Sequence, residues 1–121
     1  SRQEEAPVFA TEEGRMAKYL IQASYTQAGL QGLVRDGGSK RRSVVERMIE
    51  ALGGRMESFY YAFGKTDLYF VADMPDNADV AALSLAITAA GGATAHVTVL
   101  LTPEELDAAA KKTVAYTAPG Q

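Results

Sequence analysis

The chain has 121 residues, of which 47% are hydrophobic and 22% charged, and its formal net charge is −3. This length suits a single domain with its own apolar core, and the absence of cysteine excludes disulfides, thiolate metal ligands and cysteine nucleophiles. The weak negative charge argues against nucleic acid or anionic lipid as a partner. A single histidine excludes a multi-histidine metal centre within one subunit.

Residues 1–15 differ from the rest of the chain, because they carry four Glu, a Pro and a Gly without the period of a helix or strand. We expect a leader or extension without fixed structure there, with the domain at residues 16–121; the alternative is a docking tail that uses Val8 and Phe9. No signal-peptide pattern is present. The uncharged stretch 80–101 is long enough for a membrane span, but its period changes midway, which favours a buried helix and then a buried strand. We therefore expect a cytoplasmic protein without membrane contact.

The first half of the domain predicts strand, helix and strand. Residues 18–24 alternate and contain aromatic and β-branched side chains, as strands do. Thr26 is a suitable N-cap for a short helix. Ser39 is predicted to cap a longer helix, residues 39–52, which has an apolar stripe and ends at two glycines. Residues 55–63 then have the composition of a second strand.

The second half predicts strand, helix, strand and a short helix. Residues 64–66 form a predicted tight turn into a third strand, residues 67–73. A Pro-Asp-Asn sequence is expected to cap a helix over residues 78–90, and residues 94–101 alternate as a fourth strand. A Thr-Pro-Glu-Glu capping box begins a final helix that ends at about residue 112.

The resulting order, β-α-β-β-α-β, is that of a ferredoxin-like α+β fold. We expect a four-stranded antiparallel sheet with both main helices on one face. The other face then holds either the odd-numbered or the even-numbered residues of 18–24, and both sets include apolar side chains. Such a face implies a partner, and a second copy packed sheet against sheet would give a dimeric α+β barrel. The nearly uncharged helix 78–90 indicates further cover, from higher assembly or from the C-terminal helix.

Four segments resemble the GYD domain family: MAKYLIQASYT, GLQGLVRDGGSKRR, LGGRMESFYYAFGKTDLYFVADMPDN and LLTPEEL. The strongest marks are Leu52-Gly53-Gly54, Gly64-x-x-Asp67 and Pro75-Asp76-Asn77, while Thr66 stands before Asp67 where the family's Gly-Tyr-Asp signature has Tyr. The resemblance covers Met16 to about Pro119. It implies a ferredoxin-like dimeric α+β barrel with no agreed biochemical activity. Related dimeric barrels include monooxygenases, isomerases, cyclases and dehydratases, which is an analogy of fold alone.

Five polar residues are candidates for contacting a small organic molecule in a cleft between sheet and helices: Arg42, Tyr61, Asp67, Tyr69 and His96. His96 is the one side chain expected to titrate near neutrality, although a hydrogen-bonded sheet histidine is an alternative. Arg42 precedes the buried stripe of its helix and could hold an anion, or lie in a solvated basic turn.

The register of the hairpin between the second and third predicted strands determines which face of the sheet Tyr61 and Tyr69 occupy. If Phe63 pairs with Asp67, then Tyr61, Asp67 and Tyr69 share one face of the sheet. Their hydroxyls could orient a ligand or lie in a dimer interface, where tyrosine is common. Asp67 could instead accept backbone N–H groups of its own turn.

We therefore predict a homo-oligomeric protein that binds a small organic molecule and has no assigned activity. One alternative is a structural protein without ligand. Another is a proton-transfer enzyme, of isomerase, cyclase or monooxygenase kind, with His96 or a carboxylate as base and tyrosines polarising an enolate. A third is a haem or flavin protein with His96 as ligand. We predict no cofactor, because the sequence has no G-x-G-x-x-G, P-loop or H-x-x-x-H motif. Binding or catalysis predicts a cavity of roughly 300 Å³ on which His96 and two tyrosines converge.

Overall fold

The computed structural model describes residues 16–62 and 64–121, so the predicted leader at residues 1–15 lies outside the described residues. The chain has an α+β fold with the elements β1 (Ala17–Tyr25), α1 (Gln27–Asp36), α2 (Gly38–Ala51), β2 (Arg55–Tyr61), β3 (Leu68–Met74), α3 (Asn77–Ala89), β4 (Ala93–Leu100) and α4 (Pro103–Ala110). Each predicted strand and helix is present with small shifts at its ends, and α1 is longer than expected.

The four strands form one sheet in the order β2-β3-β1-β4, and every pair of neighbours is antiparallel. The predicted four-stranded antiparallel sheet is therefore confirmed. Strands β1 and β3 are central, with Ile21 opposite Phe70 on one side and Val97 on the other. Strands β2 and β4 form the two edges.

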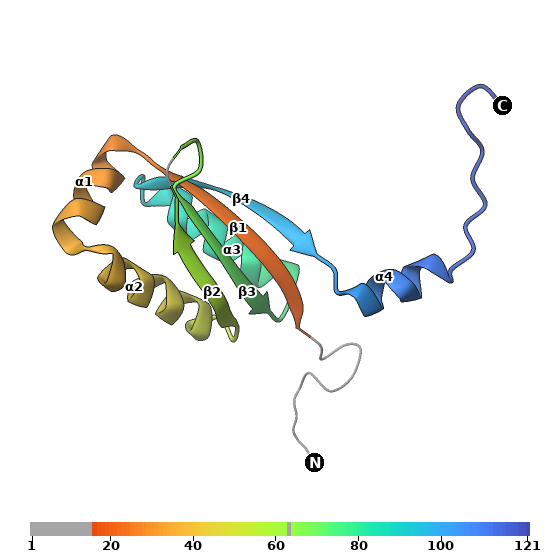
Figure 1. The fold of residues 1–121 in the computed structure, drawn as a ribbon, viewed down its shortest axis with the longest axis horizontal. Helices are drawn as coiled ribbons and strands as arrows, with labels where there is room; N and C mark the ends of the chain where they lie inside the picture. Colours follow the sequence, from red (N-terminus) through yellow and green to blue (C-terminus); the bar gives the residue numbers. More distant parts are fainter. Residues whose placement is uncertain (1–15, 63) are drawn as a thin grey trace, which may run out of the picture.

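Helices α2 and α3 cover one face of this sheet (Figure 1). The core between them consists of alternate strand residues and the inner helix residues: Tyr19, Ile21, Ala23, Leu68, Phe70, Ala72, Val45, Ile49, Val80 and Leu83. The odd-numbered side chains of β1 thus point to the helices, because successive strand residues alternate between faces. The even-numbered ones lie on the opposite face, which no element covers in the described part of the chain. We call it the open face.

The predicted hairpin register is wrong by one residue. Tyr61 lies opposite Leu68, and the Ala62 N–H donates to the Asp67 carbonyl at 2.8 Å, so the loop holds four residues instead of three. The predicted partner Phe63 lies outside the described residues. Because a slip of one residue exchanges the faces of a strand, Tyr61 lies on the helix-covered face and Tyr69 on the open face.

Capping residues fix where the helices begin. The side chains of Thr26, Asp76 and Thr102 each accept a hydrogen bond from a main-chain N–H of the first turn, as predicted. The prediction for Ser39 is wrong, since the N-cap of α2 is Gly37 and no side chain caps it. Gly37 is also the C-cap of α1, so a single residue separates α1 from α2 and the two helices meet at a tight corner.

Helix α4 leaves the end of β4 and projects away from the sheet, followed by residues 111–121 (Figure 1). Within residues 16–62 and 64–121, no helix is both long enough and apolar enough to cross a membrane.

Candidate functional site

A cavity of about 250 Å³ lies between the sheet and the helices, at the end of the sheet where β1 meets α1. We call it the helix–sheet cavity. Its apolar floor consists of Ala23, Val45, Leu68, Ile87 and Ala93. Its polar rim consists of Tyr25, Arg35, Asp36 and Arg41. An apolar floor with a few converging polar groups is the usual composition of a small-molecule site.

Two glycines of α1 keep the wall of the cavity open. Gly29 packs against the turn before β4 so closely that a Cβ there would lie 1.9 Å from the Gly92 carbonyl oxygen. A Cβ on Gly32 would meet only a side-chain nitrogen of Arg35, at 3.7 Å. The first glycine thus lets α1 approach the sheet, and the second leaves the space beside it empty.

Two tyrosines, Tyr25 and Tyr61, lie next to each other beside the cavity. The hydroxyl of Tyr61 donates to the Gly38 carbonyl at 2.9 Å, and Tyr61 lies close enough to Tyr25 to affect its pKa. Burial, together with the neighbouring Tyr61, raises the pKa of Tyr25 to about 12, although the charge of Arg41 acts in the opposite direction. Burial also raises the pKa of Tyr61. Both phenols are therefore neutral at physiological pH.

Arg41 gives the cavity its positive charge. It is half-buried and lies one helical turn before Val45, so both side chains of α2 line the same space. Among the described residues Arg41 has no carboxylate within ion-pair distance, whereas Arg35 lies 3.8 Å from Asp36. Two guanidinium groups and one carboxylate leave a net charge of +1 at the rim.

Asp67 holds the end of β1 in place. Its carboxylate accepts a hydrogen bond from the Tyr25 N–H at 2.8 Å, and its own N–H donates to the Ala23 carbonyl at 3.0 Å. The acceptor role predicted for Asp67 is therefore exerted on β1 and not on its own turn. Asp67 positions a residue of the cavity without lining it.

The structure separates the five predicted site residues. Tyr61 and Asp67 lie beside the helix–sheet cavity. Tyr69 and His96 lie on the open face, on either side of Gln22 in one cross-strand row. Arg42 is exposed and does not line the cavity.

Two residues of the cavity, Arg41 and Tyr25, were not predicted as site residues, although each continues a pattern that is visible in the sequence. Arg41 continues the stripe of Val45 and Ile49 backwards by one turn, at spacing i, i+4. Arg42 lies 100° away around the helix, since α-helices have 3.6 residues per turn. Tyr25 continues the odd-numbered buried side of β1 to its last residue. Extending each stripe past its last apolar member would have found both.

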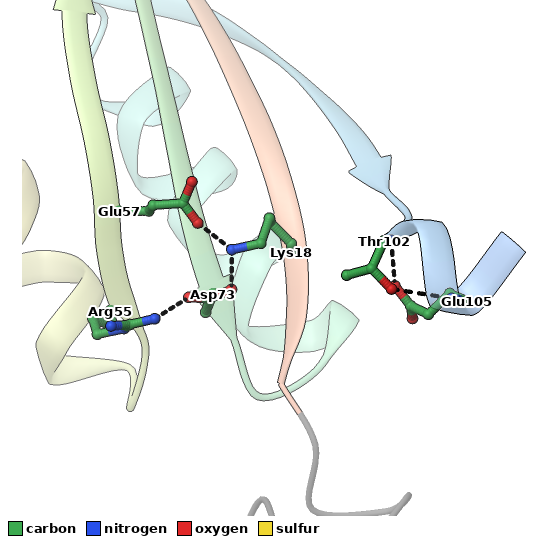
Figure 2. A network of polar contacts seen from close by, with 6 residues as sticks. All are labelled: Lys18, Arg55, Glu57, Asp73, Thr102 and Glu105. Atoms are coloured by element: carbon green, nitrogen blue, oxygen red, sulfur yellow. Dashed lines mark hydrogen bonds and ion pairs between the residues drawn. The ribbon is translucent and has the colours of Figure 1, made fainter.

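A second polar cluster lies on the open face, at the opposite end of the sheet (Figure 2). Lys18 and Arg55 each donate to the carboxylate of Asp73 at 2.9 Å, and Lys18 also contacts Glu57. Burial favours a higher pKa for Asp73, but the hydrogen bonds from Lys18 and Arg55 outweigh it and lower the pKa. The hydrogen bonds to Glu57 and Asp73 raise the pKa of Lys18. Lys18 and Asp73 thus stay ionised at neutral pH, and the cluster combines two basic with two acidic side chains.

Within residues 16–62 and 64–121, no three His, Asp or Glu side chains are grouped so as to hold a metal ion. The comparison with protein families identifies residues 19–110 as a match to the model of the GYD domain. No curated protein matches the chain. The match includes the cavity, the open face and α4.

Proposed function

The chain belongs to the GYD domain family, and from this premise we propose that it is a homo-oligomeric α+β barrel that binds a small organic anion in its helix–sheet cavity. The observation that carries the proposal is the half-buried Arg41 above an apolar floor, without a carboxylate partner among the described residues. Hydrogen bonds between a guanidinium group and a carboxylate are among the strong ones, so an anionic ligand would supply a partner for Arg41.

The size of the cavity limits the ligand. A dry apolar cavity of about 150 Å³ holds benzene, so a volume of about 250 Å³ accommodates one ring and a carboxylate. The floor suits the apolar body, while Arg41 can hold the carboxylate through two parallel hydrogen bonds. We therefore propose a monocarboxylate with a single ring or a short branched chain.

The arrangement favours binding over proton transfer. A base must reach the proton that it removes, but His96 lies on the other face of the sheet from the cavity. The carboxylate of Asp67 is already held by the Tyr25 N–H, and Tyr25 itself stays neutral. Tyr25 lines the cavity and Asp67 fixes its main chain, and both roles suit a binding site.

We propose that the open face is covered by the open face of a second copy. Its centre is apolar, with Leu20 between Val71 and Thr98 and with Tyr69 in the next row. The charges of the Lys18 cluster cancel, so two identical faces can meet without repulsion between like charges. The strand order β2-β3-β1-β4, with β1 and β3 central, supports the ferredoxin-like topology in which such sheet-to-sheet dimers form.

The ligand proposal is tested by calorimetric titration with benzoate and with the uncharged benzamide. We expect benzoate to bind and benzamide to bind more weakly. Arg41→Gln should weaken benzoate binding by about tenfold or more, because it removes a charge-assisted hydrogen bond. Arg42→Gln, a change of the same charge at the adjacent exposed position, is the matched control and should leave the affinity unchanged. Equal losses in the two variants, or no binding of benzoate to the native protein, would overturn the proposal.

The dimer proposal is tested by the mass of the native protein in solution. Val71→Lys places a charge at the centre of the open face and should shift the assembly to smaller species. Val34→Lys adds the same charge at an exposed position of α1 and should not. A native protein that is monomeric at micromolar concentration would contradict the dimer while leaving the ligand proposal intact.

A further inference from the structure

The C-terminal part of the chain forms a projecting arm, which we define as residues 101–121. The arm carries four exposed apolar side chains, at Leu101, Leu106, Val114 and Tyr116, which are 59–78% exposed. Among residues 16–62 and 64–121, no helix or strand packs against α4 (Figure 1). The arm thus presents apolar surface to solvent along its whole length.

An isolated helix as short as α4 is only marginally stable in water. Its first turn is held by a capping box, in which Thr102 and Glu105 exchange hydrogen bonds of 2.8 and 3.0 Å (Figure 2). The remaining turns have no local support of this kind. Helices of this length owe most of their stability to packing of an apolar face, so α4 needs a surface to pack on.

Such a surface exists on the same chain, in a groove between α3 and β4 that we call the edge groove. Its volume is about 300 Å³, and its lining residues are Tyr19, Asn77, Val80, Ala81, Ser84, Val97 and Val99. Val99 is 56% exposed although it points to the helix-covered side of the sheet. The hydroxyl of Tyr19 donates to the side chain of Asn77 at 2.6 Å, and apart from these two residues and Ser84 the lining is apolar.

The dimensions of the two surfaces agree. Eight residues of α4 span about 12 Å, and the stretch of α3 from Asn77 to Ser84 spans about the same length. The groove wall carries the small residues Ala81 and Ser84, and α4 carries Leu106 and three alanines at its end. Small residues on both sides allow two helices to approach closely, with the leucine filling the space above Val99.

The junction between β4 and α4 is extended, and the arm leaves it in a direction away from the sheet (Figure 1). Thr102 is extended, with φ −74° and ψ 160°, and its side chain is engaged in the capping box. Pro103 also restricts the residue before it to extended conformations. In this conformation the arm points away from the sheet and leaves the edge groove of its own chain uncovered (Figure 1).

We propose that the arm of one protomer occupies the edge groove of a second copy. In a two-fold arrangement each protomer donates one arm and accepts one, which closes the assembly. This interface differs from that of the sheet-to-sheet dimer, since it involves the helix-covered side of the sheet and the edge strand β4. Both interfaces can exist in one assembly, and each has its own test.

The test is disulfide cross-linking, for which this chain is well suited because it has no cysteine. Ala81→Cys places a thiol in the edge groove and Leu106→Cys places one on α4. When the two single variants are mixed and oxidised, we expect a covalent dimer whose linked peptides contain positions 81 and 106. Ser84→Cys, one turn further along the groove, is a second partner for Leu106→Cys in case the first variant does not fold.

The control pairs Leu106→Cys with Val34→Cys, an exposed position on α1, and defines the yield from random collision. In the double variant Ala81→Cys/Leu106→Cys, exchange predicts a covalent dimer, whereas a cross-linked monomer would show that the arm folds back in its own chain. A cross-linked monomer, or a yield no higher than that of the control, would overturn the proposal. Val99→Glu should lower the yield of the 106–84 link, because it places a charge in the groove.

Discussion

The carboxylate of Asp67 lies 2.8 Å from the main-chain nitrogen of Tyr25 and accepts its hydrogen bond. Tyr25 is the last residue of β1 and lines the helix–sheet cavity. Asp67 is also the carboxylate in the part of the chain that resembles the Gly-Tyr-Asp signature. Its place in the fold therefore gives this carboxylate a positioning role, since it fixes the main chain from which the tyrosine of the cavity projects.

Replacement of Asp67 tests this role. Asp67→Ala leaves the Tyr25 N–H without its charged acceptor and should lower the free energy of unfolding by about 1.5–3 kcal/mol. Asp67→Asn keeps an acceptor oxygen and should cost less. Urea denaturation of the three proteins measures both values. A loss below about 0.5 kcal/mol in the alanine variant would mean that the hydrogen bond does not hold β1.

Alanine substitutions at the two glycines of α1 should change the stability of the protein in opposite directions. Gly32→Ala should stabilise the protein by about 0.5–1 kcal/mol, because alanine is the better helix former and the added methyl group has space. Gly29→Ala should destabilise it, because the methyl group would overlap the Gly92 carbonyl. Thermal unfolding of both variants gives the comparison. Two changes of the same sign would contradict the packing of α1 described above.

Asp73 should make the protein sensitive to acid. Its pKa in the folded state lies below the ordinary value of 3.8, so its ionised form stabilises the fold above that value. The contribution is lost as the pH falls through the folded-state pKa. Asp73→Asn should be less stable at neutral pH and should lose less stability on acidification below about pH 4. Asp107→Asn on the exposed helix α4 is the control and should follow the native curve, measured by urea denaturation at a series of pH values.

Tyr25 should affect stability at alkaline pH. Its pKa rises from 10.0 to about 12 on folding, so the neutral phenol stabilises the fold fully below pH 10. This contribution is lost as the pH rises through 12. The difference in tyrosinate absorbance between the native protein and Tyr25→Phe should therefore develop near pH 12 in the folded state and near pH 10 in urea. A midpoint near 10 in the folded state would show that Tyr25 is accessible to water.

The positions of the strands and helices could be predicted from the sequence because their signals are local. Thr26, Asp76 and Thr102 cap their helices through bonds that span three residues. The alternation in β1 and the i, i+4 stripe of α2 each follow from the geometry of a single element. The uncovered sheet face followed as well, because right-handed crossovers place both main helices on the same side of the sheet.

Which residues meet was decided by the tertiary structure. One additional loop residue between β2 and β3 moves Tyr61 toward the helices and Tyr69 away from them. Tyr25, Arg41 and Tyr61 come from β1, α2 and β2, and their encounter depends on the corner between α1 and α2 and on the close approach of Gly29 to Gly92. The sequence by itself thus determined the elements and their apolar faces, where each contact is short-range along the chain. The register and the cavity were determined only by tertiary packing, because they depend on distances between residues far apart in the sequence.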